Sequence, residues 1–237
     1  MGKLFAVGDL HLSFTSEKPM GVFGSNWDEH YVKIEKNWRA EVSNDDTVFI
    51  LGDISWALKF AEAEADLLWI HGLPGRKVLL KGNHDLWWQS VTRLRALYDD
   101  MYFMQNDSVD VGGGVVLCGS RGWLTPQEPS FSESVDRKIY ERELIRLRLS
   151  LEDATRRAAE MEGAARLVCG LHFAPSARPG MDSGFMDMLE EFGVEQMVYG
   201  HLHGREAFKK GVMGVRNGVD YSLASADYLD FRPLRVI

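Results

Sequence analysis

The sequence predicts an α/β fold for this chain of 237 residues. Three observations predict it: short apolar runs of strand length recur, helical patterns fill the stretches between them, and 45% of the residues are hydrophobic. Strands that alternate with helices are typical of α/β proteins. A chain of this length can bury one large core. We therefore expect one domain over residues 1–237.

Six short apolar runs are expected to form buried strands. Each run is continuous, and several are rich in β-branched residues, as is typical of strands covered on both faces. Each run also ends in a polar motif. The runs are residues 4–7, 48–51, 78–80, 115–118, 167–171 and 197–199.

Three helices are expected between these runs. Residues 27–42 carry apolar side chains at spacings of three and four, and residues 57–70 are rich in Ala, Leu and Glu. The longest candidate, residues 132–163, alternates steps of four and three, a pattern that also suits a short coiled coil. We favour an amphipathic helix that docks on the sheet before the strand at 167–171.

The C-terminal part has a different pattern. Short strand-like pieces separated by Gly or Asp predict an antiparallel meander or hairpins there. Near the N-terminus, residues 13–25 carry Gly, Pro and Ser, and we expect them to form a mobile loop. The C-terminal pieces are residues 205–209, 212–216, 221–223 and 234–237.

Composition excludes several classes of protein. The net charge of −8 argues against a broad basic surface for nucleic acid. Cys118 and Cys169 lie in apolar runs and are expected to be buried free thiols. No stretch approaches the ~18 apolar residues that a membrane span needs, and the N-terminus lacks a signal-peptide pattern. We expect a cytoplasmic protein without a membrane partner, and the sequence gives no indication of oligomeric state.

The strongest functional signal is the position of the histidines. Five of the seven follow a predicted strand and its Gly or Asn turn. His30 and His71 lie elsewhere and are expected to be ordinary packing or surface residues. Side chains at the carboxyl ends of parallel strands share one crevice, where open α/β sheets bind ligands. The five residues are His11, His84, His172, His201 and His203.

These histidines belong to an ordered set of motifs rich in metal ligands. Asp9 and His11 are two positions apart, so they share one side of an extended chain. The Asp53 carboxylate could bridge two cations, and the Asn83 amide adds an oxygen. Two carboxylates, one amide and four imidazoles suit two borderline divalent ions such as Mn, Fe or Zn. Without thiolates a structural zinc knuckle is excluded. The other three imidazoles are those of His172, His201 and His203.

The ordered motifs DxH, GD, GNHD, H and GHxH resemble those of the calcineurin-like metallophosphoesterases. The resemblance runs from Asp9 to His203. It implies two mixed β-sheets packed face to face as a sandwich, with α-helices outside, in four layers. It also implies two divalent metal ions bridged by Asp53. The first ion would be held with Asp9, His11 and His203, and the second with Asn83, His172 and His201.

The activity implied by this resemblance is hydrolysis of a phosphate mono- or diester by a hydroxide that bridges the two ions. His84 would be the catalytic histidine that is not a ligand, and it would protonate the leaving group. Asp85 would orient His84 by fixing its tautomer. The expected partner is a small phosphorylated substrate, and we do not expect nucleic acid.

Arg121 is a candidate substrate ligand. It follows the apolar run 115–118 and lies between Gly119 and Gly122, where the backbone can bend tightly. A guanidinium there could bind a phosphate oxygen through two parallel hydrogen bonds. The alternative is a surface arginine paired with a nearby acid.

Other functions stay open at this stage. A nuclease of the same superfamily needs basic clusters interleaved with aromatic residues, but acidic residues dilute the arginines of the long helix, which favours a solvated helix face. A protein phosphatase is a further alternative. An inactive scaffold usually loses a ligand or the catalytic histidine, and neither is missing here. Four tryptophans near the motifs could line a pocket or pack in the core: Trp56, Trp87, Trp88 and Trp123.

Overall fold

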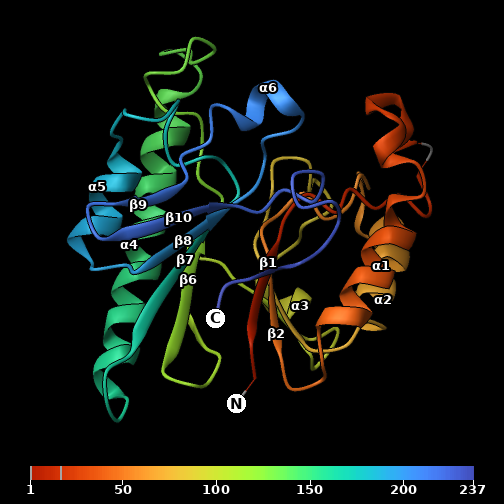
Figure 1. Cartoon of the computed structure of the whole chain (residues 1–237), viewed down its shortest axis with the longest axis horizontal. Coiled ribbons are helices and arrows are strands. Elements are labelled where there is room, and N and C mark those ends of the chain that lie inside the picture. The colour runs from red at the N-terminus through yellow and green to blue at the C-terminus, as the bar shows by residue number, and fades with distance from the viewer. Residues whose placement is uncertain (1, 17) are drawn as a thin grey trace. The chain divides into compact units, whose positions relative to one another are not determined.

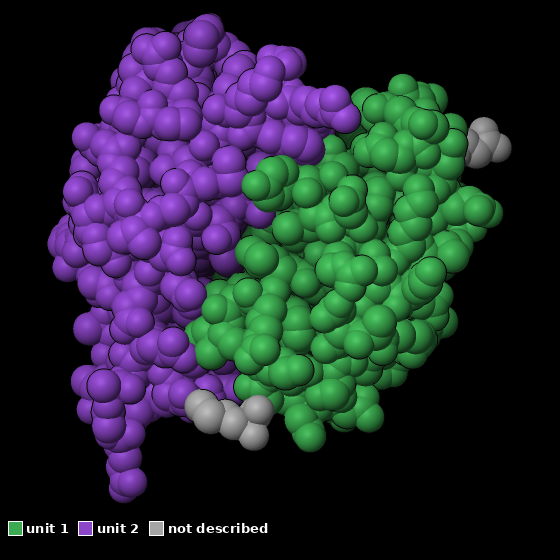
Figure 2. Space-filling model, viewed as in Figure 1, with its two compact units in different colours: residues 1–103, 224–237 green, residues 104–223 purple. Residues whose placement is uncertain are grey.

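The computed structural model describes residues 2–16 and 18–237. The chain divides into two compact units (Figure 2): unit 1 comprises Met1–Phe103 and Ala224–Ile237, and unit 2 comprises Met104–Leu223. Each unit contains one mixed β-sheet with its own helices. The predicted α/β class with two mixed sheets is therefore confirmed. The single domain over residues 1–237 stays a prediction.

Unit 1 is built on a five-stranded sheet in the order β11-β1-β2-β3-β4 (Figure 1). Strands β1 to β4 are parallel, and β11 pairs with β1 in the antiparallel sense. The carboxyl ends of β1, β2 and β3 therefore face the same edge of the sheet. The strands are Leu4–Val7 (β1), Thr47–Ile50 (β2), Arg76–Leu79 (β3), Met101–Phe103 (β4) and Leu234–Arg235 (β11).

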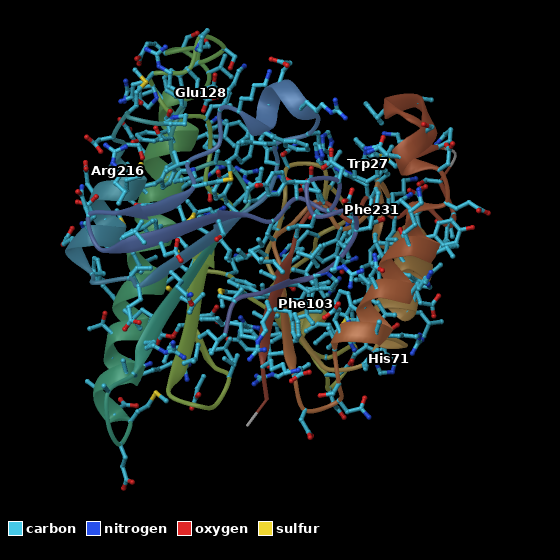
Figure 3. All side chains as sticks on the ribbon, in the orientation of Figure 1. Trp27, His71, Phe103, Glu128, Arg216 and Phe231 are labelled. Carbon is cyan, nitrogen blue, oxygen red and sulfur yellow. The ribbon has the colours of Figure 1, made fainter. Side chains whose placement is uncertain are left out.

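Helices α1 and α2 present buried faces with helical spacing to the core of unit 1. Ile34 and Trp38 of α1, and Leu67 and Ile70 of α2, are at most 1% exposed. Trp27 and Phe231 are both labelled in Figure 3, and their ring centroids lie 5.1 Å apart. The helices are η1 (Met20–Phe23), η2 (Ser25–Trp27), α1 (His30–Glu41), α2 (Phe60–His71) and α3 (Val91–Leu94).

Unit 2 is built on a six-stranded sheet in the order β5-β6-β7-β8-β10-β9. The four central strands are parallel, whereas β5 and β9 are antiparallel edge strands. The strands are Val109–Asp110 (β5), Val115–Ser120 (β6), Arg166–Leu171 (β7), Gln196–Tyr199 (β8), Gly214–Arg216 (β9) and Val219–Leu223 (β10).

The long helix α4 (Arg137–Glu160) docks on the sheet of unit 2, as predicted. It packs against β6 and β7, with Leu147, Leu151 and Ala154 fully buried. Helix α5 (Gly184–Glu191) joins the same core, and α6 (Arg205–Phe208) follows β8. In the described part of the chain, no helix is both long enough and apolar enough to cross a bilayer.

Parts of the C-terminal prediction were wrong. Residues 205–209 form the short helix α6 rather than a strand, because Gly204 turns the chain at φ 78° and leaves these side chains exposed or half-buried. Strand β10 is antiparallel to β9, as a hairpin requires, but it also pairs in parallel with β8. Residues 200–218, which connect β8 to β10, are long enough for the crossover that two parallel strands need. Strands β4 and β5 were missed because they are only three and two residues long.

Two further expectations concern residues 13–25 and the two cysteines. The segment contains η1 and the start of η2, and its residue 17 lies outside the described residues. Its mobility stays a prediction. Cys118 and Cys169 are buried free thiols, as expected.

Candidate metal centre

The metal ligands expected in unit 1 follow three neighbouring parallel strands. Asp9 and His11 come after β1, Asp53 after β2 and Asn83 after β3. Backbone hydrogen bonds join the first two loops: Asp9 N donates to Gly52 O at 2.9 Å, and His11 N donates to Asp53 O at 2.9 Å. The sheet thus brings these residues to one edge, as the sequence predicted.

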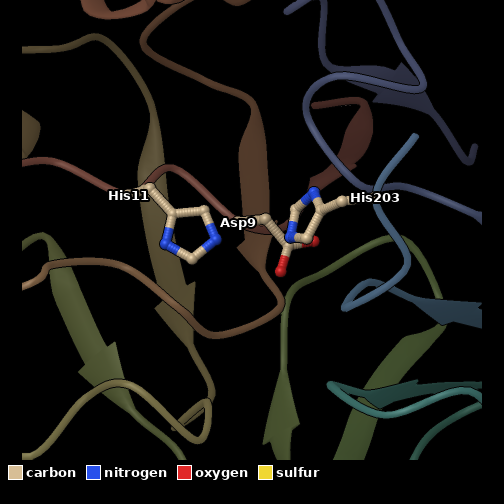
Figure 4. A group of neighbouring side chains, drawn as sticks. All are labelled: Asp9, His11 and His203. Atoms are coloured by element: carbon tan, nitrogen blue, oxygen red, sulfur yellow. The ribbon is translucent and has the colours of Figure 1, made fainter. Parts of the chain in front are cut away.

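The carboxylates of Asp9 and Asp53 are buried, and each lies near the imidazole of His11. Asp9 is 0% exposed and Asp53 is 1% exposed. Figure 4 shows Asp9 and His11, whose ligand atoms lie within 4.8 Å of each other; the third labelled residue, His203, belongs to unit 2. Nε2 of His11 lies 3.9 Å from Oδ2 of Asp53. Two ligands of one small divalent ion lie roughly 3.0–3.5 Å apart, so little movement would place both on one ion.

Backbone strain is concentrated at the candidate ligands. Asp9, His11 and Asp53 have φ values of 60°, 45° and 50°, and His201 of unit 2 has a φ of 70°. A residue other than glycine in this left-handed region costs about 1–3 kcal/mol, and such residues cluster at functional sites. Four of the seven expected ligands carry this strain.

The Asp53 carboxylate is held by the loop that follows β3. His84 N donates a hydrogen bond to Asp53 Oδ1 at 2.8 Å. A Cβ atom on Gly82 would lie 2.1 Å from both the backbone N and Oδ1 of Asp53. Only glycine permits this approach, so the glycine of the GNHD motif serves to seat the loop against Asp53.

Asp85 ties the two ligand loops together. Its fully buried carboxylate accepts hydrogen bonds from Gly82 N at 2.7 Å, Ile54 N at 2.9 Å and Trp87 Nε1 at 3.0 Å. A fourth bond comes from Ser55 N at 3.2 Å. The sequence did not predict this joining role, because backbone donors leave no signal in the motif. The orientation of His84 by Asp85 stays a prediction.

His84 is more accessible than the buried Asp9, His11 and Asp53. Its side chain is 43% exposed, and its Nε2 lies 3.9 Å from Asp53 Oδ2. The Trp56 ring centroid is 4.3 Å from that of His84 and 4.8 Å from that of His11, with the latter pair stacked at 19°. Trp56 therefore packs on both site histidines, whereas Trp87 and Trp88 are buried in the core of unit 1.

The two histidines outside the motifs are packing and surface residues, as predicted. His30 is buried, and its ring nitrogens lie 3.0 Å from Leu10 O and 3.2 Å from Trp27 O. Burial lowers the pKa of His30. His30 also fixes the loop between Asp9 and His11, which the sequence did not reveal. The half-exposed side chain of His71 pairs with Asp100 at 2.7 Å.

In unit 2 the expected ligands follow two adjacent parallel strands. His172 comes after β7, and His201 and His203 come after β8. His172 is fully buried, and its ring centroid lies 5.0 Å from that of His201. Ligand nitrogens of His172 and His201 lie within 4.8 Å of each other. The ring of Phe173 covers His201 at 4.0 Å between centroids.

Arg121 pairs with an acid, which was the alternative considered for it. Its Nη2 donates to Oε1 of the fully buried Glu143 at 3.1 Å. Its guanidinium lies 4.5 Å from the Trp123 ring centroid. Its carbonyl oxygen accepts hydrogen bonds from His172 N at 3.1 Å and Phe173 N at 3.0 Å. Arg121 thus adjoins the unit 2 histidines, and its contact with substrate stays a prediction.

The donor set fits divalent metal ions. Unit 1 offers buried carboxylate oxygens, an amide oxygen and the imidazole of His11, and unit 2 offers three imidazoles. Oxygen and imidazole nitrogen without thiolate suit Mn, Fe or Zn. The tight approach of Gly82 to Asp53 and the strained ligand backbones show that the structure fixes these groups in place.

The family model described as calcineurin-like phosphoesterase matches residues 2–205. The chain belongs to this family. The match covers every motif from Asp9 to His203, and thus candidate ligands of both units.

Two curated relatives of this chain are phage proteins named "Gene 66 protein". The protein from Mycobacterium phage L5 is 38% identical over 85 residues, 36% of this chain and 41% of the relative. The protein from Mycobacterium phage D29 is 33% identical over 102 residues, 41% of this chain and 49% of the relative. The chain thus spans less than half the length of these relatives.

Two solved structures share the fold of this chain. The phosphopantetheinyl hydrolase from Mycobacterium tuberculosis has a TM-score of 0.56 at 15% identity, covering 100% of this chain and 96% of that one. A protein of unknown function from Aquifex aeolicus has a TM-score of 0.51 at 16% identity, covering 99% and 95%. At these identities the likeness establishes the fold alone.

Proposed function

We propose that this phosphoesterase is a dinuclear, metal-dependent hydrolase of small phosphate mono- or diesters. The observation that carries the proposal is the placement of all seven expected ligands in the loops that follow parallel strands, β1 to β3 in unit 1 and β7 and β8 in unit 2, with four of the seven on strained backbone. Strain of this kind persists where a function requires a fixed geometry. Membership of the family supports the hydrolysis of a phosphate ester.

The proposed ligand sets draw on both units. One ion would be held by Asp9, His11 and His203, and Asp53 would bridge to the second. The family match over residues 2–205 supports a site that needs both units, because it includes the motifs of each. The second ion would be completed by Asn83, His172 and His201.

The chemistry of the site divides between the ions and the side chains. When bound, two divalent ions polarise phosphoryl oxygens and lower the pKa of bound water. His84 is exposed, is not needed as a ligand and packs on Trp56, so its imidazole can deliver a proton to the leaving oxygen. Asp53 and Asp85 keep the loop that carries His84 fixed.

Two further observations support parts of the proposal. One neighbour of the same fold is named a phosphopantetheinyl hydrolase, which supports a small phosphorylated molecule as the substrate class. The two cysteines are buried free thiols, and this supports the reducing cytoplasm as the location.

The experiment is a turnover screen on protein stripped with a chelator and reloaded with Mn²⁺, Fe²⁺, Co²⁺ or Zn²⁺. Substrates are an aryl phosphomonoester, an aryl phosphodiester, a cyclic nucleotide and single-stranded DNA. We expect turnover of a small ester that disappears with the chelator and returns with metal. Absence of turnover with every metal would favour the inactive scaffold, and preferential cleavage of DNA would favour the nuclease.

A further inference from the structure

Three guanidinium groups converge on one oxygen of Glu143 in unit 2. Nη1 of Arg146 lies 3.0 Å from Glu143 Oε1, Nη2 of Arg121 lies 3.1 Å from it and Nη2 of Arg142 lies 3.5 Å from it. Glu143 is fully buried, and its Oε2 has no hydrogen-bond partner among residues 2–16 and 18–237. One carboxylate therefore collects three cations and neutralises the charge of only one.

The remaining positive charge reaches the surface. The side chains of Arg142, Arg146 and Arg121 are 52%, 37% and 16% exposed. Burial and the charges of Arg142 and Arg146 lower the pKa of Arg121, and Glu143 opposes this shift. An anion bound here would relieve the repulsion among the three guanidiniums.

Other arginines of α4 are matched by acids, unlike this cluster. Arg148 forms two hydrogen bonds to Glu191, at 3.0 and 2.8 Å. Arg157 pairs with Asp153 at 3.0 Å, and Arg156 pairs with the same carboxylate and with Glu160. The excess of positive charge is thus local to the cluster around Glu143, in a chain whose net charge is −8.

Aromatic packing connects the cluster to the candidate metal ligands of unit 2. The guanidinium of Arg121 lies over Trp123, whose ring centroid is 5.0 Å from that of Phe173. Phe173 in turn covers His201. The carbonyl of Arg121 also receives the backbone hydrogen bond of His172. Two aromatic rings thus connect the guanidinium of Arg121 to His201.

Trp123 is fixed in this position by the start of α4. Its Nε1 donates to Asp136 Oδ1 at 2.9 Å, and Asp136 is 8% exposed. The face of a fixed indole beside a guanidinium offers an apolar surface for the part of a substrate that links two charged groups.

We propose that the cluster of Arg121, Arg142 and Arg146 binds a second phosphate of the substrate, distinct from the ester that is hydrolysed. The inference rests on the proposed function and narrows its substrate class to molecules with two phosphate groups separated by a spacer. Guanidinium groups suit this task, because their forked donors match phosphate oxygens. Glu143 is a positioning residue that holds the three arginines together.

The test measures binding with ligands that cannot be hydrolysed. Calorimetry on metal-loaded protein compares an alkane bisphosphonate with the alkyl monophosphonate of the same chain length. We expect the wild-type protein to bind the bisphosphonate about tenfold more tightly, with an advantage that shrinks at high salt. Arg146→Gln and Arg142→Gln should each reduce this advantage severalfold.

The matched control is Arg148→Gln, which removes an exposed arginine of the same helix outside the cluster and should retain the advantage. Melting temperatures establish that each variant is folded. Equal affinity for both ligands in the wild-type protein would overturn the proposal, as would a full advantage in both folded cluster variants. Phosphonates report binding alone, so failure of the hydrolase screen would be distinguishable from failure of this test.

Discussion

The two units differ in the chemistry of the metal ligands expected in each. Unit 1 offers Asp9, Asp53 and Asn83, and thus the oxygen ligands that attract divalent cations. Unit 2 offers three histidines and the arginine cluster, which are neutral or positive. The carboxylates expected to hold metal thus lie in one unit, whereas the cationic groups suited to an anionic ester are concentrated in the other.

The units also fix their site residues by different means. In unit 1 hydrogen bonds from the backbone hold the carboxylates, as those to Asp85 and Asp53 show. In unit 2 aromatic rings pack against the site, as Phe173 does on His201. Three strained ligand backbones lie in unit 1, and one, that of His201, lies in unit 2.

The largest loss of turnover is expected from a change at His84, which belongs to unit 1 and is not an expected ligand. His84→Ala should retain both metals and lower turnover by about 10²–10⁴-fold, because a general acid contributes that much. The loss should be greater for an alkyl ester than for an activated aryl ester. The control is His71→Ala, a half-exposed histidine paired with Asp100. Equal losses on the two esters would exclude the general-acid role.

A smaller effect contrasts one acid in each unit, the buried Asp66 and the half-buried Asp153. Burial raises the pKa of Asp66 in unit 1, against hydrogen bonds from Ser55 and Phe14 N. In unit 2 burial alone would raise the pKa of Asp153, but hydrogen bonds from Ser108, Arg157 and Arg156 outweigh it and hold the pKa well below its usual range. The two acids should therefore give opposite dependences of stability on pH.

The Asp153 contribution is present above the unfolded pKa of about 3.9 and is lost as pH falls toward the folded value. Asp153→Asn should lower the free energy of unfolding by about 1–2 kcal/mol near pH 7, and the deficit should shrink in acid.

The contribution of Asp66 to stability is present below the pKa of the unfolded state and is lost as pH rises through the pKa of the folded state. The difference in the free energy of unfolding between the wild-type protein and Asp66→Asn should therefore shift in favour of the variant as pH rises. Denaturant titrations at a series of pH values measure the free energy of unfolding of both variants. The same pH trend for Asp153→Asn and Asp66→Asn would contradict the opposite pKa shifts of the two acids.

Much of the candidate site could be predicted from the sequence because its ligands follow apolar strands directly. Asp9, Asp53 and His172 each lie within three residues of a strand end, so the strand pattern also locates the ligand. Helices α1 and α4 were predicted from apolar residues that repeat every three or four positions, and α2 was predicted from its content of Ala, Leu and Glu. Short or exposed elements such as β5 and α6 lack such a pattern and were missed.

The supporting contacts could not be predicted in the same way. Glu143 forms an ion pair with Arg121, which lies 22 residues away in the sequence. This ion pair depends on the position of α4 on β6. Periodicity gives the buried face of a helix but not its position along a sheet. Asp85 and His30 act on backbone groups of other loops, which no residue motif reveals.

We propose that two ions would be held by ligands of both units, with Asp53 contributing to both positions. The most direct test of this proposal is the metal content per chain after reloading and dialysis, measured by elemental analysis. We predict two ions in the wild-type protein, one in His201→Ala, almost none in Asp53→Asn and two in the surface control Asp45→Asn. Two ions retained in Asp53→Asn, or none in the wild-type protein, would contradict the account.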